Sequence, residues 1–135
     1  MDCKDIPILI IDDVQSMRTE IKQILLDMGF LNLLTAENGL AATLAADQSF
    51  FADTPIQLFI CDWHMEPMNG LEFLNFIKQH PIYYNIPFIM LTAEDTKENV
   101  LEAITQGVDD YIIKPLTPDK VATRVYGALK KRGLL

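Results

Sequence analysis

Short apolar runs recur along the chain, and each is followed by polar or turn-forming residues. Five of these runs predict strands, over residues 8–11, 33–36, 58–62, 87–91 and 111–113. In residues 8–11 the apolar positions are continuous rather than alternating with polar ones, which is typical of a strand buried on both faces of a sheet. The pattern therefore predicts a core built from strands that are covered on both sides.

The segments between the runs carry apolar residues at helical spacing. The first such set lies on one face of a helix that Gly29 ends: Met17, Ile21, Ile24, Leu25 and Met28. An alanine-rich helix is expected over about residues 40–47, and another over residues 71–79 that ends before Pro81.

Two more helices are predicted in the last third of the chain. The first has Thr96 or Asp95 as its cap and Gly107 as its stop, with an inner face formed by Val100, Ala103 and Ile104. Thr117 caps the second and Pro118 opens it, and its inner face is Val121, Val125, Ala128 and Leu129. Five strands alternating with five helices predict an α/β fold, a parallel sheet with helices on both faces.

Composition and length fit one globular domain. The chain has 135 residues, of which 50% are apolar and 22% charged, so it is long enough for one core and too short for two. No apolar run reaches the roughly 20 residues that a membrane helix needs, and the start lacks the pattern of a signal peptide. We expect no membrane insertion, a cytoplasmic location, and reduced thiols at Cys3 and Cys61.

The formal charge of −8 argues against direct binding of nucleic acid, which depends on Lys and Arg neutralising phosphates. The basic residues 130–132 lie where cations favour the negative end of a helix, which is their simpler explanation.

Five polar residues directly follow predicted strands or end them: Asp12, Asp13, Asp62, Thr92 and Lys114. Because ligands of open parallel sheets bind beyond the carboxyl ends of the strands, we expect one crevice to collect all five. Each also has a simpler interpretation. The two adjacent aspartates could cap a helix, Asp62 and Thr92 could serve caps or turns, and Lys114 could be a solvated lysine.

Three carboxylates in one crevice repel each other unless a cation joins them, and a hard ion with oxygen ligands such as Mg²⁺ fits. With Lys114 and Thr92, such an ion would hold the oxygens of a phosphoryl group. Asp62 stands alone on the central strand and is the natural nucleophile, whereas Asp12 and Asp13 are better placed to hold metal.

The ordered set of motifs resembles the receiver domain of two-component response regulators, and most of all the single-domain, chemotaxis-type members. The motifs are Asp12-Asp13, Asp62 with the loop to Gly70, Thr92-Ala93, and Lys114-Pro115 preceded by Tyr111. The resemblance covers residues 6–131 and implies one receiver domain over residues 1–135. It also implies a flavodoxin-like, doubly wound sheet with strand order 2-1-3-4-5.

By this resemblance, Asp62 accepts a phosphoryl group from a phosphohistidine on a sensor histidine kinase or phosphotransfer protein. Mg²⁺, with Mn²⁺ as a substitute, would be held by Asp13, Asp62 and the backbone carbonyl of His64, with Asp12 helping through water. The protein would be a signalling switch that assists its own phosphorylation and dephosphorylation, and not an enzyme that turns over an external metabolite.

The resemblance further implies that Thr92 and Lys114 contact the phosphoryl oxygens and that Tyr111 follows Thr92 inward. This motion would change the surface formed by the fourth helix, last strand and last helix, which a downstream protein would recognise. A cis peptide is implied before Pro115. The resemblance also implies that His64 and Glu94 tune the lifetime of the phosphoryl group, although His64 could equally be a partly exposed loop histidine. Glu66 departs from the family pattern, which has proline there, so the shape of the loop over the metal stays open.

Rival interpretations remain. A small Mg²⁺-dependent phosphatase of the haloacid dehalogenase type also uses an aspartyl nucleophile, but it should carry Asp-x-Asp after the first strand, where this chain has Asp12-Asp13-Val14. A receiver-like scaffold that is never phosphorylated would not need the complete acidic pocket. A flavin-binding protein of the same fold would not place two repelling carboxylates in its phosphate loop.

Overall fold

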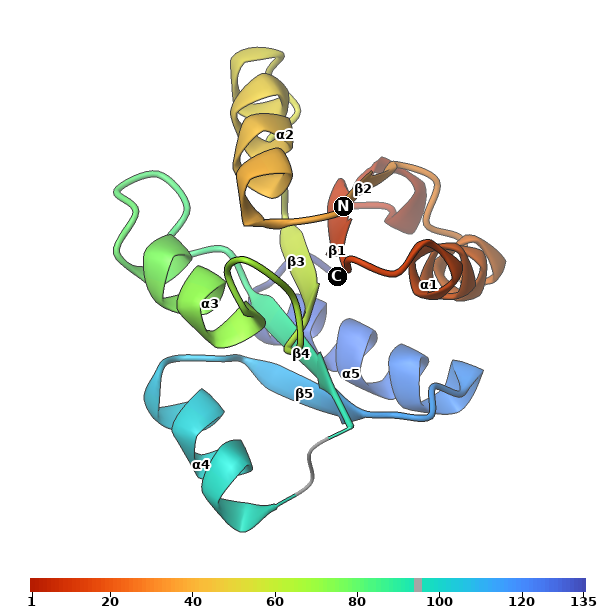
Figure 1. The fold of residues 1–135 in the computed structure, drawn as a ribbon. Helices are drawn as coiled ribbons and strands as arrows, with labels where there is room; N and C mark the ends of the chain where they lie inside the picture. Colours follow the sequence, from red (N-terminus) through yellow and green to blue (C-terminus); the bar gives the residue numbers. More distant parts are fainter. Residues whose placement is uncertain (94–95) are drawn as a thin grey trace.

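A five-stranded parallel sheet runs through the centre of the molecule. The structure is a computed structural model, and it describes residues 1–93 and 96–135. The strands are β1 (Ile8–Ile11), β2 (Leu33–Ala36), β3 (Leu58–Asp62), β4 (Phe88–Thr92) and β5 (Asp110–Ile113). Their order is β2-β1-β3-β4-β5, with every neighbouring pair parallel (Figure 1). The predicted fold class and strand order are confirmed.

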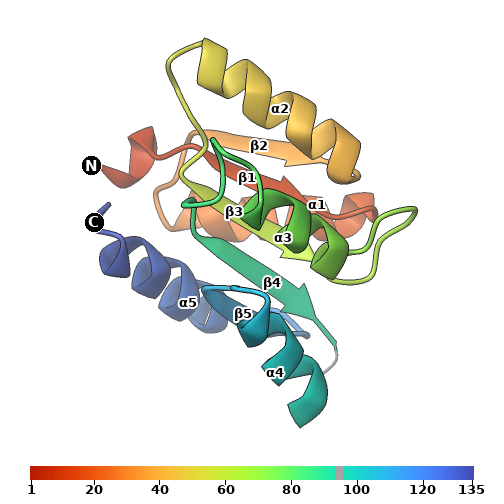
Figure 2. The ribbon, with the colours of Figure 1, turned by 90° about the vertical axis from the view of Figure 1, so that its left-hand side faces the viewer.

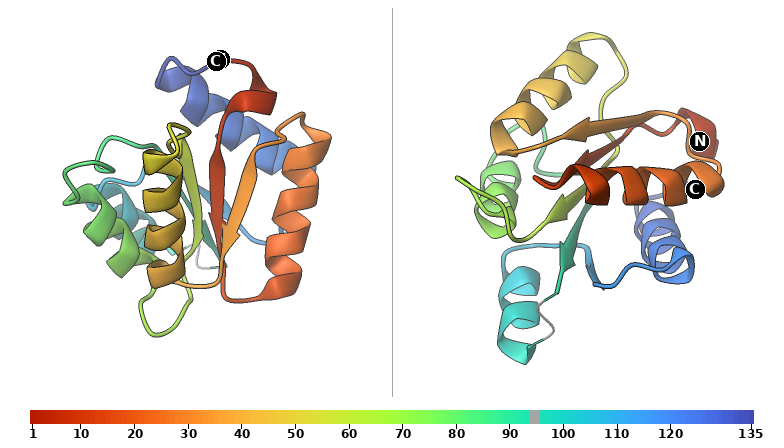
Figure 3. Two further views of the ribbon diagram at one scale, coloured as in Figure 1. Left: turned by 90° about the horizontal axis from the view of Figure 1, so that it is seen from above. Right: turned by 45° about the vertical axis from the view of Figure 1, so that its right-hand side comes forward.

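Helices cover both faces of this sheet. They are α1 (Gln15–Asp27), α2 (Gly39–Phe51), α3 (Gly70–Lys78), α4 (Lys97–Thr105) and α5 (Pro118–Lys131), after a short 3₁₀ helix η1 (Cys3–Asp5). Helices α1 and α5 pack on one face, and α2, α3 and α4 pack on the other (Figures 2 and 3). Among the described residues, no helix has the length and apolar character needed to cross a bilayer.

The sheet divides the buried side chains into two cores because successive residues of a strand point to opposite faces. In β1, Ile8 and Ile10 belong to the core under α1 and α5, whereas Leu9 and Ile11 belong to the core under α2 and α3. The strand is therefore buried on both sides, as its unbroken apolar sequence predicts.

Local sequence signals begin and end the helices. Asn69 caps α3 in a capping box, because its side chain accepts from the backbone N–H of Glu72 at 2.8 Å and the Glu72 carboxylate accepts in return. Thr96 caps α4 and Thr117 caps α5, with Pro118 at the first helical position. Gly29 follows α1 with a φ of 100°, which a residue with a side chain rarely adopts.

Two helix predictions need correction. Helix α2 was expected to end near Asp47, but it continues to Phe51, and Ser49 in the added turn is buried. Ile104 was expected on the inner face of α4, yet its side chain is exposed. Ala103 alone is fully buried on this helix, and Val100 is half-buried. Of the three predicted inner-face residues, only Ile104 was therefore misassigned to the core.

Candidate functional site

The register of the sheet brings the ends of four strands to one edge. Ile11 pairs with Cys61, so the next residues along, Asp12 and Asp62, lie beside each other. Asp62 itself pairs with Leu91, one residue before Thr92. On the other side, Thr92 pairs with Ile113, and the backbone N–H of Lys114 donates to the Thr92 carbonyl at 2.8 Å.

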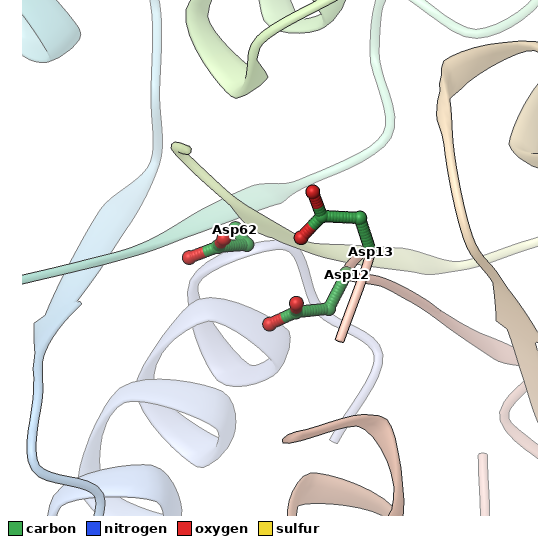
Figure 4. A group of neighbouring side chains, drawn as sticks. All are labelled: Asp12, Asp13 and Asp62. Carbon is green, nitrogen blue, oxygen red and sulfur yellow. The ribbon is translucent and has the colours of Figure 1, made fainter. Parts of the chain in front are cut away.

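Three carboxylates gather at this edge. Each of Asp12, Asp13 and Asp62 offers an oxygen, and these oxygens lie within 4.8 Å of one another. Figure 4 shows the three side chains approaching one another from the end of β1 and the end of β3. Asp12 and Asp62 are buried, whereas Asp13 is exposed, so the cluster has a closed inner side and an open outer side.

Only one of the two carboxylate oxygens of Asp12 has a hydrogen-bond partner among the described residues. Its Oδ1 accepts from the backbone N–H of Val14 at 2.9 Å, which is the local turn role that the simpler interpretation predicts. Its Oδ2 is buried and has no hydrogen-bond partner among the residues that the structure describes, which is unusual for a buried polar atom. Burial raises the pKa of the Asp12 carboxyl, and the nearby charges of Asp62 and Asp13 raise it further.

Lys114 supplies the positive charge of the site. Its Nζ donates to Oδ1 of Asp62 at 2.7 Å, and both side chains are largely shielded from solvent. Among the described residues, this is the ion pair that the three carboxylates make, so the carboxylates outnumber the cation paired with them.

The loop after β3 is fixed closely over the strand end. The backbone N–H of Gly70 donates to the Trp63 carbonyl at 2.7 Å. A Cβ at Gly70 would lie 2.3 Å from the Asp62 carbonyl oxygen and 2.8 Å from Cα of Trp63, so only glycine fits. The peptide bonds before Pro67 and Pro115 are both cis, the second as the resemblance implies.

The same loop lines a cavity of about 480 Å³ beside the carboxylates. Its lining residues are Asp13, Trp63, His64, Met65, Glu66 and Asn69. His64 and Glu66 are exposed there, so Glu66 brings a further negative charge to the mouth of the site. The ligand role of the His64 carbonyl and the tuning role of its side chain stay predictions.

The two residues of the expected switch lie on neighbouring strands. Thr92 is buried at the end of β4, and Tyr111 is half-buried on β5, where it pairs with Met90. The guanidinium of Arg124 lies 5.8 Å from the centre of the Tyr111 ring, and its Nη1 is 3.3 Å from Asp110. Glu94, the other expected tuning residue, lies outside the described residues.

The donor set fits a hard divalent cation. It offers carboxylate oxygens, one of them the unpartnered buried Oδ2 of Asp12, and the cavity leaves room for water and phosphate oxygens. Mg²⁺ binds in proteins through one or two carboxylates completed by such ligands.

Three supporting contacts escaped the sequence analysis. Arg18 Nη1 donates to the Asp12 carbonyl at 2.6 Å, the Cys61 thiol donates to the Asp62 carbonyl at 3.3 Å, and Gly70 permits the close loop. Burial raises the pKa of the Cys61 thiol, so this cysteine stays protonated. The spacing Asn69-x-x-Glu72 signals a capping box and would have located the end of the loop.

Fold and site together define a doubly wound α/β protein with an acidic pocket at the carboxyl edge of its sheet. The chain belongs to the response regulator receiver domain family, whose model matches residues 8–126. Receiver domains bind Mg²⁺ at an acidic pocket and act as signalling switches in two-component systems.

The curated relatives are chemotaxis proteins of similar length. The chain is 39% identical to chemotaxis protein CheY1 of Helicobacter pylori over 111 residues, which are 82% of this chain and 86% of that protein. It is 36% identical to chemotaxis protein CheY-3 of Vibrio cholerae over 114 residues, 84% of each chain.

Solved structures agree with this assignment. The chemotaxis protein CheY4 of Vibrio cholerae matches with a TM-score of 0.82 at 27% identity, covering 92% of this chain and 98% of that one. A CheY from Borrelia burgdorferi, solved in a CheX-CheY-BeF₃-Mg²⁺ complex, matches with a TM-score of 0.81 at 27% identity, covering 90% of this chain and 87% of that one.

Proposed function

We propose that this protein is a phosphorylation-dependent switch whose phosphoryl acceptor is Asp62. The observation that carries the proposal is the surroundings of this one carboxylate. It is buried at the end of the central strand, with two further carboxylates within 4.8 Å and the Lys114 ammonium at 2.7 Å. A nucleophile held between a cation and metal-binding acids suits phosphoryl transfer, which depends on positioning and charge neutralisation.

In the proposed reaction a carboxylate oxygen of Asp62 attacks the phosphorus of a phosphohistidine on a sensor histidine kinase or phosphotransfer protein. The O–P bond forms as the P–N bond breaks, and the imidazole leaves with the electron pair of that bond. Mg²⁺ held by Asp13, Asp62 and the His64 carbonyl, with Asp12 helping through water, would neutralise charge on the phosphoryl oxygens. Lys114 would hold one of these oxygens by its charge, and Thr92 would donate a hydrogen bond to another.

The change would then reach the surface of α4, β5 and α5. Thr92 ends β4 and Tyr111 lies on the adjacent strand, so an inward shift of Thr92 would leave space beside Tyr111. Arg124 of α5 lies over the Tyr111 ring, and a rotation of that ring would therefore disturb this face. We propose that a downstream protein binds there, and that residues 6–131 form one receiver domain. The cytoplasmic location stays a prediction.

Intact-mass spectrometry tests the proposal. With Mg²⁺ and a small phosphodonor such as phosphoramidate, the wild type should gain one phosphoryl group and Asp62→Asn should gain none. Asp53→Asn is the matched control, because Asp53 is exposed and has a φ of 63°, a conformation that asparagine tolerates. An unmodified wild type would favour the scaffold hypothesis, and steady release of phosphate from an aryl phosphate would favour the phosphatase.

A further inference from the structure

The outer face of α2 is unusually apolar for a surface helix. Leu40, Leu44 and Phe51 fall at i, i+4 and i+11, which places them in one stripe along the helix. They are 73%, 55% and 83% exposed. The opposite face is also apolar, because Ala42 and Ala46 are buried in the core. The side chains of the stripe therefore do not contribute to the core of the domain.

A groove next to this stripe continues the apolar surface onto α3. Its volume is about 210 Å³, and its lining is Gly39, Leu40, Thr43, Met68, Phe73 and Phe76. Met68 belongs to the loop whose other residues line the acidic cavity, so this one loop contributes to both the groove and the cavity. We define the α2–α3 surface as Leu40, Leu44, Phe51, Met68 and Phe76.

The helices that form this surface are firmly joined. The Tyr83 hydroxyl, after α3, donates a short hydrogen bond to the Asp47 carboxylate of α2. The Tyr83 ring stacks on His80 with their centroids 4.3 Å apart, and His80 contacts Phe76 edge-on. The groove is thus preformed, which lowers the entropic cost of binding to it.

The charge around the α2–α3 surface has one sign. Residues 23–77 contain no Lys and no Arg, although they include seven acidic residues: Asp27, Glu37, Asp47, Asp53, Asp62, Glu66 and Glu72. Glu37 and Asp53 flank α2 at its two ends, and Glu66 and Glu72 flank Met68; all four are exposed. Lys78, the next cation along the chain, is 3.5 Å from Asp109.

From these observations we propose that the α2–α3 surface docks a basic amphipathic helix of a partner protein. The apolar face of that helix would cover the stripe and fill the groove, and its Lys and Arg residues would face the acidic rim. A second copy of this chain is a poorer occupant, because each copy carries a formal charge of −8 and would bring the same acidic rim. The proposal does not depend on phosphorylation of Asp62.

A synthetic peptide provides the probe. We would use a fluorescein-labelled Leu/Lys peptide of about 18 residues, or five helical turns, with leucines on one face. Fluorescence anisotropy should show saturable binding that weakens as ionic strength rises from about 0.05 to about 0.5 M. A peptide with the same leucines and Glu in place of Lys, and a scrambled Leu/Lys peptide, should both bind at least about tenfold more weakly.

Variants locate the binding surface. Leu44→Gln and Phe51→Gln should each weaken binding of the Leu/Lys peptide by about tenfold, the equivalent of losing one buried apolar contact. Leu31→Gln, in the loop before β2, is the matched control, since Leu31 is 64% exposed, between the 55% of Leu44 and the 73% of Leu40. It should leave the affinity within about twofold, and circular dichroism should show that all three variants are folded.

Several results would overturn the proposal. These are no saturable binding, equal binding of the scrambled or acidic peptide, or a loss of affinity with Leu31→Gln as large as with Leu44→Gln. Sedimentation that shows a wild-type dimer abolished by Leu44→Gln would assign the surface to a second copy instead. Because the probe contains no phosphohistidine, each result stands whatever the outcome of the phosphorylation test on Asp62.

Discussion

Lys114 and Asp62 are joined across the carboxyl edge of the sheet, with Nζ of the lysine 2.7 Å from Oδ1 of the aspartate. They are 52 residues apart in sequence and come from β3 and the end of β5, with β4 between their strands. Among the described residues, this is the ion pair made by the cluster of three acids.

Replacing Lys114 should therefore change the stability of the protein, in addition to any effect on phosphoryl transfer. Lys114→Met should lower the free energy of unfolding of the metal-free protein by about 1–3 kcal/mol at pH 7, because Asp62 loses its partner. Urea unfolding measures this change. Millimolar Mg²⁺ should restore part of the loss by supplying another cation. Equal stability of variant and wild type without metal would show that the ion pair contributes nothing to folding.

Asp12→Asn should act in the opposite direction on stability. The substitution removes a buried carboxyl group whose pKa is raised. We therefore expect the free energy of unfolding of the metal-free protein to rise by about 1 kcal/mol at pH 7. Because the folded state favours the protonated acid, the gain should be small near pH 4 and grow as the pH rises towards 7. A gain that does not change with pH would contradict this account.

The same variant should bind Mg²⁺ more weakly. Trp63 lines the cavity beside the carboxylates, and it is the sole tryptophan, so its fluorescence provides the signal for a titration. We expect the apparent affinity to fall by about tenfold or more in Asp12→Asn, as is usual when a group supporting a metal is removed. An unchanged titration would place the ion away from Asp12.

The loop at Gly70 should not tolerate a methyl group. Gly70→Ala would force the Asp62 carbonyl and Trp63 apart, and should destabilise the protein by about 1–3 kcal/mol. Gly127→Ala is the matched control, because a Cβ there meets nothing within 4 Å and the residue lies inside α5. It should stabilise the protein by about 0.5–1 kcal/mol. Thermal unfolding measures the change in stability of both variants. Two changes of the same sign would contradict this prediction.

The hydrogen bond between Tyr83 and Asp47 should make stability sensitive to alkaline pH. Burial and the Asp47 carboxylate raise the pKa of Tyr83 above its ordinary value of 10.0. The stability it contributes is therefore complete below about pH 10 and is lost at higher pH, where only the unfolded chain ionises. Tyr83→Phe should be about 1–2 kcal/mol less stable than the wild type at pH 8, and this difference should shrink near pH 10.5.

The exposed Tyr84 supplies the control for that experiment. Tyr84→Phe should follow the wild type at both pH values, because Tyr84 is 56% exposed. A constant difference between Tyr83→Phe and the wild type across this pH range would contradict the explanation.

Sequence reasoning recovered the strands well because each is an apolar run with a clear end. The predicted residues 8–11, 33–36 and 58–62 match β1, β2 and β3 residue for residue. The strand ends also brought Asp12, Asp62, Thr92 and Lys114 to one edge, since parallel strands share that edge.

The features that could not be predicted from the sequence depend on tertiary contacts. Ile104 has the spacing of a core residue, yet it faces solvent, and periodicity cannot separate a core face from a surface that awaits a partner. The contact of Arg18 with the Asp12 carbonyl and the fit of Gly70 against Asp62 both require the fold to be known. The chemical roles of the site residues stay predictions until the phosphorylation experiment is done.

Because the five residues of the pocket lie at four separate strand ends, a piece of the chain that stops before Lys114 cannot assemble it. Lys114 comes last, after β5, and β5 joins the sheet through β4 alone. During synthesis the acids would thus emerge well before their cation. The complete pocket would then exist only in fully folded molecules, and incompletely folded molecules would be unable to accept a phosphoryl group.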